Sequence, residues 1–118
     1  MTQALYTRQP HGAFVDIAEL VALVERARAQ MTEALDELVT KLAAASSSDA
    51  DVDFAGLVNA AQRLLAMDDG DMARLLKVSR PTIGRWVRGV SAPHALGRGA
   101  IFDALSGQAR IRIKNLRG

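Results

Sequence analysis

The sequence contains no cysteine and few aromatic residues. Without cysteine, the chain forms no disulfide and offers no thiolate to a metal ion, and we expect a reducing, intracellular compartment. One Trp, one Tyr and three Phe leave the core of this 118-residue chain to Ala, Leu, Val and Ile. Because sheets favour β-branched and aromatic residues whereas Ala and Leu favour helices, this composition predicts an all-α fold.

Long apolar runs and catalytic motifs are missing as well. The stretch from Phe14 to Val24 is apolar, but Asp16 and Glu19 interrupt it, so we expect neither a signal peptide nor a membrane span. The sequence has no Gly-rich phosphate loop and no nucleophile elbow. Its two histidines, His11 and His94, lack neighbouring metal ligands. We therefore expect a cytoplasmic protein that is not an enzyme and has no cofactor or metal.

The charge is unevenly distributed along the chain. The net charge is +2, yet residues 1–50 hold four Lys/Arg against seven Asp/Glu, and residues 51–73 hold one against five. Residues 74–118 hold ten Lys/Arg against a single Asp. Such a separation favours a polyanionic partner for the C-terminal part. The alternative is a basic segment that is simply solvated.

The N-terminal part predicts a flexible leader over residues 1–13 and a helical oligomerisation segment over residues 14–45. The helix would be roughly 45 Å long at 1.5 Å per residue, with one apolar stripe that must be buried against something. Pairing with a second copy as a coiled coil is favoured, and folding back onto the C-terminal helices is the alternative. The predicted dimerisation residues are Ile17, Leu20, Val21, Val24, Met31, Leu35, Leu38 and Leu42.

Small and acidic residues over 46–52 predict a linker, followed by a domain over residues 53–106. Its apolar spacing predicts four helices; Asp51 or Asp53 can cap the first, and Asp68–Asp71 and Ser79 are placed to cap the next two. Asp68, Asp69 and Asp71 lack the rest of a calcium loop, which favours capping. The expected helices cover residues 54–67, 72–77, 79–88 and 95–106. Over residues 107–118, alternating apolar and basic side chains predict a short C-terminal β-strand or a basic arm.

The segment around residues 72–89 predicts two short helices joined by a tight turn. Two helices cross steeply only where the facing residue is small, and Ala73 meets this need. The expected core of the unit is Ala73, Leu76, Val78, Ile83 and Trp86. Ser79 is placed to cap the second of these helices, and Pro81 falls in its first turn, where a missing N–H is not needed.

The outward side of the same helix carries Arg80, Thr82, Arg85 and Arg88, and Gly84 would allow close approach to a groove. Arginine can bind guanine O6 and N7 through two hydrogen bonds or hold phosphates. The helix N-terminus also favours anions. These features predict a helix that lies in the major groove of DNA.

The pattern A-x-x-L-x-V-S-x-x-T-I-x-R-W-x-x-G, with Pro four residues later, resembles the Cro and lambda-repressor-type (XRE-type) helix-turn-helix family. The resemblance covers residues 53–106 and implies about five helices. It also implies that the loop from Gly89 to His94 lies near the DNA backbone. Lys77 stands where the family usually has Gly, so a left-handed backbone is expected there. Asp69 and Asp71 stand where a phosphate-contacting Gln or Thr is common.

Together these features predict a sequence-specific transcriptional regulator, a homodimeric repressor or activator that reads a two-fold operator with residues 79–88. It would be associated with the nucleoid when bound to double-stranded DNA. One alternative is an antitoxin or accessory module whose N-terminal helix binds a partner protein while its basic domain autoregulates. Another is a structural helical protein. The predicted DNA-binding residues are Ser79, Arg80, Thr82, Arg85, Arg88, Lys77, Ser91 and His94.

Overall fold

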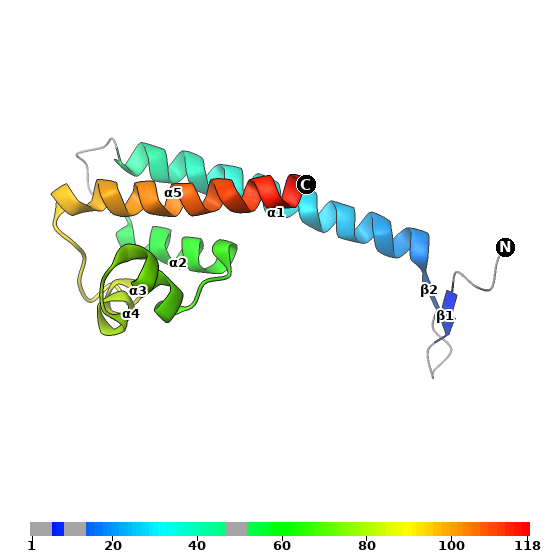
Figure 1. Ribbon diagram of the computed structural model, residues 1–118, viewed down its shortest axis with the longest axis horizontal. Coiled ribbons are helices and arrows are strands. Elements are labelled where there is room, and N and C mark those ends of the chain that lie inside the picture. Colours follow the sequence, from blue (N-terminus) through cyan, green and yellow to red (C-terminus); the bar gives the residue numbers. More distant parts are fainter. Residues whose placement is uncertain (1–5, 9–13, 47–51) are drawn as a thin grey trace. The chain divides into compact units, whose positions relative to one another are not determined.

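The computed structural model describes residues 6–8, 14–46 and 52–118, and this part of the chain is predominantly α-helical (Figure 1). It confirms the all-α fold. Two compact units are present, Met1–Met31 and Thr32–Gly118, and the first helix runs from one into the other. The elements are β1 (Tyr6–Arg8), β2 (Phe14–Asp16), α1 (Ile17–Ser46), α2 (Phe54–Leu65), α3 (Asp69–Leu76), α4 (Arg80–Val87) and α5 (Ala95–Arg117).

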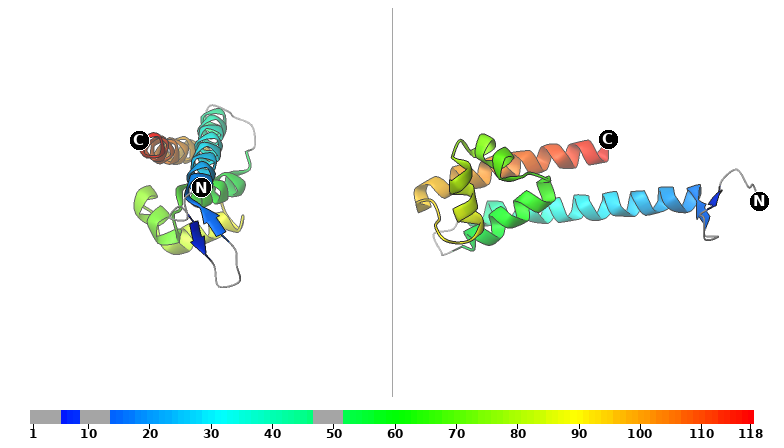
Figure 2. Two further views of the ribbon diagram at one scale, coloured as in Figure 1. Left: turned by 90° about the vertical axis from the view of Figure 1, so that its right-hand side faces the viewer. Right: turned by 90° about the horizontal axis from the view of Figure 1, so that it is seen from below.

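The first unit begins with a short antiparallel pair of strands. Tyr6 pairs with Asp16 and Arg8 pairs with Phe14, and Figure 2 shows this pair next to the start of α1. The prediction of a flexible leader is therefore wrong for Tyr6–Arg8, because a three-residue strand is too short to leave a periodic signal in the sequence. The Asp16 carboxylate then accepts a hydrogen bond from the Ala18 N–H at 2.9 Å and caps α1.

Helix α1 matches the predicted helix, although it begins at Ile17 because residues 14–16 form β2. Its sequence lacks Gly and Pro, so nothing interrupts its 30 residues. Within the first unit its apolar side chains are about half exposed, at 47–55% of their surface. These exposed side chains are Ile17, Leu20, Val21, Leu23 and Val24. Met31, at the end of this unit, is partly buried.

The C-terminal half of α1 belongs to the second unit, where Leu35, Leu38 and Leu42 are at most 3% exposed. It runs antiparallel to α5: an Arg117 guanidinium nitrogen lies 3.3 Å from the Asp36 carboxylate, and Ser46 approaches Gly99 (Figure 1). The assignment of these three leucines to a dimer interface is therefore wrong, because the core of their own chain already covers them. For this half of α1, the alternative of folding back onto the C-terminal helices is correct.

The centre of the second unit is aromatic despite the small number of such residues. Phe54, at the start of α2, makes an edge-to-face contact with Trp86 of α4 at a centroid distance of 5.4 Å. The same ring lies 5.8 Å from the ring of Phe102 in α5. Val58, Ile83 and the three rings are at most 6% exposed, so one cluster joins α2, α4 and α5.

Helix α5 continues to Arg117, and the predictions of a helix end near residue 106 and of a C-terminal strand or arm are wrong. The alternation of apolar and basic residues over 109–114 predicts a strand, but some of the same residues also belong to an apolar stripe at helical spacing. Phe102, Leu105, Ala109 and Ile113 are spaced by three or four residues and are all buried. Burial of this stripe outweighs the local period of two and the interior Gly107.

None of the helices in the described part of the chain is both long and apolar enough to span a membrane.

Candidate nucleic-acid interface

Helices α3 and α4 pack against each other around the predicted small residue. Ala73 is 7% exposed, and Ile83 and Trp86 of α4 are 0% and 6% exposed. Leu76 and Val78 are half-buried. Of the five residues that were predicted to form the core of this unit, three are thus buried and two are half-buried. A hydrogen bond from Asn59 of α2 also fixes α4 to α2.

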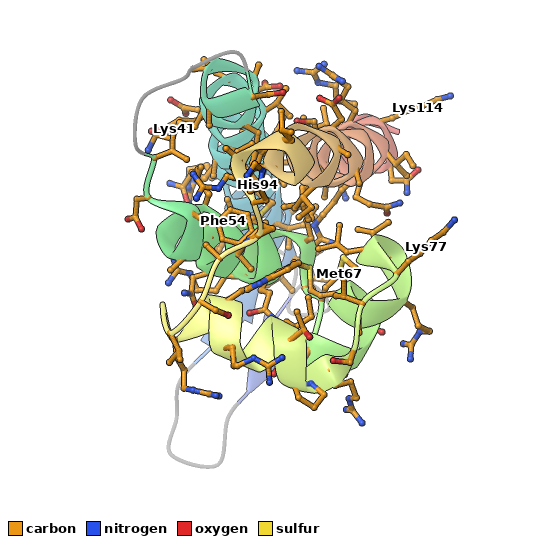
Figure 3. All side chains as sticks on the ribbon, turned by 90° about the vertical axis from the view of Figure 1, so that its left-hand side faces the viewer. Lys41, Phe54, Met67, Lys77, His94 and Lys114 are labelled. Atoms are coloured by element: carbon orange, nitrogen blue, oxygen red, sulfur yellow. The ribbon has the colours of Figure 1, made fainter. Side chains whose placement is uncertain are left out.

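The turn between α3 and α4 depends on Lys77. Its backbone is left-handed, with φ +58° and ψ +44°, as expected for this residue. The following Val78 N–H bonds to the Ala73 carbonyl at 3.1 Å and closes the end of α3. A left-handed non-glycine residue costs about 1–2 kcal/mol. The exposed Lys77 side chain extends away from α3 (Figure 3).

Acidic residues cap the N-terminus of α3. The Asp68 carboxylate accepts from the Asp71 N–H at 2.8 Å, and the Asp71 carboxylate accepts from the Asp68 N–H at 3.1 Å. The hydrogen bond from Asp71 lowers the pKa of Asp68, and the nearby charges of Arg80 and Arg74 act in the same direction. The predicted capping role of this acidic turn is confirmed. These carboxylates also occupy N–H groups that would otherwise be available to a phosphate.

The other acidic residue of this turn is tied to α2. The Gln62 amide donates a hydrogen bond to the Asp69 carboxylate at 2.7 Å. Arg74, one turn further along α3, forms a close ion pair with Asp71. The three aspartates therefore all have intramolecular partners.

On α4, three polar side chains form a connected row. Ser79 accepts from the Thr82 N–H at 3.2 Å as the N-cap, and the two hydroxyl oxygens are 2.8 Å apart. An Arg85 guanidinium nitrogen then donates to the Thr82 hydroxyl at 3.1 Å. Arg85 is exposed, so this chain of bonds fixes the direction of a cationic side chain at the surface. Pro81 occupies the first turn as predicted.

The other two arginines of this region lie across glycines. The Arg80 guanidinium lies over Gly70 of α3, where an added Cβ would be 3.2 Å from its Nε. The Arg88 guanidinium lies over Gly84, where an added Cβ would be 3.1 Å from Nη1. Gly84 is buried beneath it, so the Arg88 side chain covers this glycine. Both arginines remain exposed.

The loop after α4 carries the remaining predicted contacts. Gly89 has φ +71°, which lets the chain turn away from the helix end, and Ser91 is exposed. His94 is the N-cap of α5, and its Nδ1 accepts from the Leu96 N–H at 3.2 Å. One His94 nitrogen therefore has a structural partner, although the residue is exposed.

One side chain that the sequence does not single out, Asn59, holds the end of α4 in place. The Asn59 amide on α2 donates to the Val87 carbonyl at 2.9 Å and to the Ala55 carbonyl at the same distance. Val87 is the last residue of α4, so this bond fixes the end of the helix that carries the arginines. An asparagine on an amphipathic helix gives no signal of such a role, because its partner is a backbone atom 28 residues away.

The described ranges contain no cluster of His, Cys, Asp or Glu suited to a metal ion, and His11 lies outside them. Comparison with known proteins gives no further assignment, because no family model, curated protein or solved structure matches the chain.

Proposed function

We propose that the chain is a sequence-specific DNA-binding protein that acts in transcription regulation and presents α4 to the major groove. The observation that carries this proposal is the row Ser79–Thr82–Arg85, which directs a guanidinium outward from a short helix. Arginine so held loses little rotamer freedom on binding a base edge or a phosphate. The tight packing of α3 on α4 supplies the rigid support that such a helix needs.

Charge supports the same proposal. Lys77, Arg80, Arg85 and Arg88 are exposed around the turn and α4, and the segment from residue 74 onward contains one acidic residue. None of these four cations makes an ion pair shorter than 4 Å with a described carboxylate, whereas Arg74 does. Positive side chains without a carboxylate partner are available to phosphates.

A second copy is the partner proposed for α1. The exposed stripe Ile17, Leu20, Val21 and Val24 lies in the part of α1 that belongs to the first unit. Two copies joined through this stripe would match a two-fold operator. Val24→Glu places a charge in the stripe and is expected to give a monomer by light scattering, whereas Glu25→Gln is the matched control and keeps the dimer. A dimer that persists in Val24→Glu would contradict this interface.

The same stripe favours the second candidate, an antitoxin or accessory module whose α1 holds a partner protein. A purified protein that is monomeric at high concentration, yet binds DNA, would favour that candidate. A protein that binds no genomic fragment at low salt would contradict both.

Selection of genomic DNA fragments on the purified full-length chain tests the DNA-binding proposal. The expected result is one enriched motif with two-fold symmetry. If six to ten phosphates are contacted, affinity falls by about 10³–10⁵ between 50 and 200 mM salt. Enrichment of no motif, with binding that depends only on salt, would contradict sequence-specific recognition.

A further inference from the structure

A groove separate from the proposed DNA-binding face lies between the end of α2, helix α3 and the C-terminal half of α5. Its volume is about 530 Å³, and all its lining residues belong to the second unit. This volume lies within the range of roughly 300–1,000 Å³ that is typical of small-molecule sites. Leu65, Leu75, Ile111 and Leu116 supply the apolar part of the wall, and Arg74, Arg112 and Asn115 supply polar groups.

Arg112 is the residue that gives the groove its chemistry. Its Nε is buried, and no acceptor among the described residues lies within hydrogen-bonding distance of it. Buried donors in folded proteins nearly always have a partner. Arg112 lines the groove, so a ligand there would meet its terminal guanidinium nitrogens rather than the buried Nε.

The other arginine of the groove already has a carboxylate. Arg74 forms its ion pair with Asp71, whose second oxygen accepts from the Asp68 N–H. No comparable pair is found for Arg112 among the described residues. The groove therefore holds two guanidinium groups and one carboxylate, and an additional anion would balance the second cation. The planar guanidinium of Arg112 matches the two oxygens of a carboxylate.

The apolar wall defines the rest of the ligand. Leu75, Ile111 and Leu116 line the same groove as Arg112, and Ile111 is 54% exposed. An exposed isoleucine beside a cation favours a ligand that has both an apolar part and a negative charge. An inorganic anion could pair with Arg112 but would leave the apolar side chains of the groove without a partner.

We propose that this groove binds a small carboxylate with an apolar chain, whose carboxylate contacts Arg112 and whose chain lies along Leu75, Ile111 and Leu116. The site lies outside the surface assigned to DNA. Its existence does not depend on DNA binding, so each proposal can fail without the other.

The test is a titration of the ¹⁵N-labelled full-length protein, without DNA, with octanoate, 1-octanol and inorganic phosphate in turn. Octanoate is expected to shift the amide signals of Leu75, Ile111 and Arg112 in a saturable manner. Octanol and phosphate are each expected to bind at least tenfold more weakly, because octanol lacks the negative charge and phosphate lacks the apolar chain. Equal binding of octanol would overturn the role of Arg112, and equal binding of phosphate would overturn the apolar half of the site.

Variants locate the site. Arg112→Met keeps the length of the side chain but removes its charge, and is expected to weaken octanoate binding at least tenfold. Arg110→Met, which changes an exposed arginine two residues away that does not line the groove, is the matched control and leaves binding unchanged. Ile111→Glu places a negative charge at an exposed position of the groove, so it tests the same site even if Arg112→Met does not fold. Unchanged octanoate binding in Ile111→Glu, or in a folded Arg112→Met, would overturn the proposal.

Discussion

The aromatic cluster predicts a specific order of destabilisation. Phe54 contacts two rings, Trp86 at 5.4 Å and Phe102 at 5.8 Å, and is 4% exposed. Phe54→Leu keeps an apolar side chain in the core but removes both ring contacts. Each aromatic pair contributes about 0.5–1.5 kcal/mol beyond the area that it buries. The free energy of unfolding is therefore expected to fall by about 1–3 kcal/mol.

Phe102→Leu is the internal comparison. It removes one described ring contact and leaves the Phe54–Trp86 pair in place, so it is expected to cost about 0.5–1.5 kcal/mol for that pair. A double-mutant cycle of the two substitutions should give a coupling energy of similar size. For a unit of this length, each kcal/mol lowers Tm by about 4–8 °C.

The assay is denaturant unfolding followed by the fluorescence of Trp86, the single tryptophan of the chain. Because Trp86 lies in the cluster itself, its signal reports directly on this core. A Phe54→Leu variant as stable as the wild type, or less affected than Phe102→Leu, would refute the conclusion that Phe54 joins three helices.

Further predictions concern the backbone and the caps. Ala66 has a left-handed backbone with φ +54°, so Ala66→Gly is expected to raise stability by about 0.5–1 kcal/mol, whereas Ala100→Gly within α5 lowers it by about 1 kcal/mol; thermal unfolding compares the two. Asn59→Ala leaves the Val87 carbonyl without its side-chain donor, so chemical denaturation should show a loss of about 1–3 kcal/mol; an unchanged midpoint would contradict this tie. The lowered pKa of Asp68 means that its stabilisation is complete above the ordinary value of 3.8 and is lost as pH falls through the lowered value. The stability difference between wild type and Asp68→Ala should therefore shrink in acid, and a difference that grows instead would contradict the capping role.

Much of the second unit could be predicted from sequence because its signals are local. The cap at Ser79, the small residue Ala73 and the left-handed Lys77 each depend on neighbours within a few positions, and the structure has all three. The resemblance to a helix-turn-helix family stays a prediction, since the comparisons neither support nor oppose it.

The errors at α5 and at the C-terminal half of α1 have one physical cause, which is packing between segments that are distant in sequence. The buried side of α5 decides that residues 109–114 are helical, although their local pattern alternates. Leu35 and Leu38 are likewise buried within the second unit of their own chain, although their local pattern predicts a stripe for a second chain. No local pattern shows which surface an apolar stripe will cover.

The positions of the arginines at the candidate site also could not be predicted from local spacing alone. Sequence spacing predicts that Arg80, Arg85 and Arg88 share one outward side of α4. In the structure only Arg85 is held by a side-chain hydrogen bond on that helix, whereas Arg80 lies over Gly70 and Arg88 over Gly84. Arg85 is therefore the arginine whose direction the structure defines most clearly.

The proposal that α4 reads DNA through Arg85 is tested by the affinity of Arg85→Ala for the selected fragment. Arg63→Ala, which removes an exposed arginine of α2, is the matched control. We expect loss of a base contact to cost about 1–3 kcal/mol, or roughly 5- to 150-fold in Kd, with Arg63→Ala close to wild type. Equal affinity of Arg85→Ala and the wild-type protein, in a variant with unchanged thermal stability, would contradict the assignment of α4 as the recognition helix.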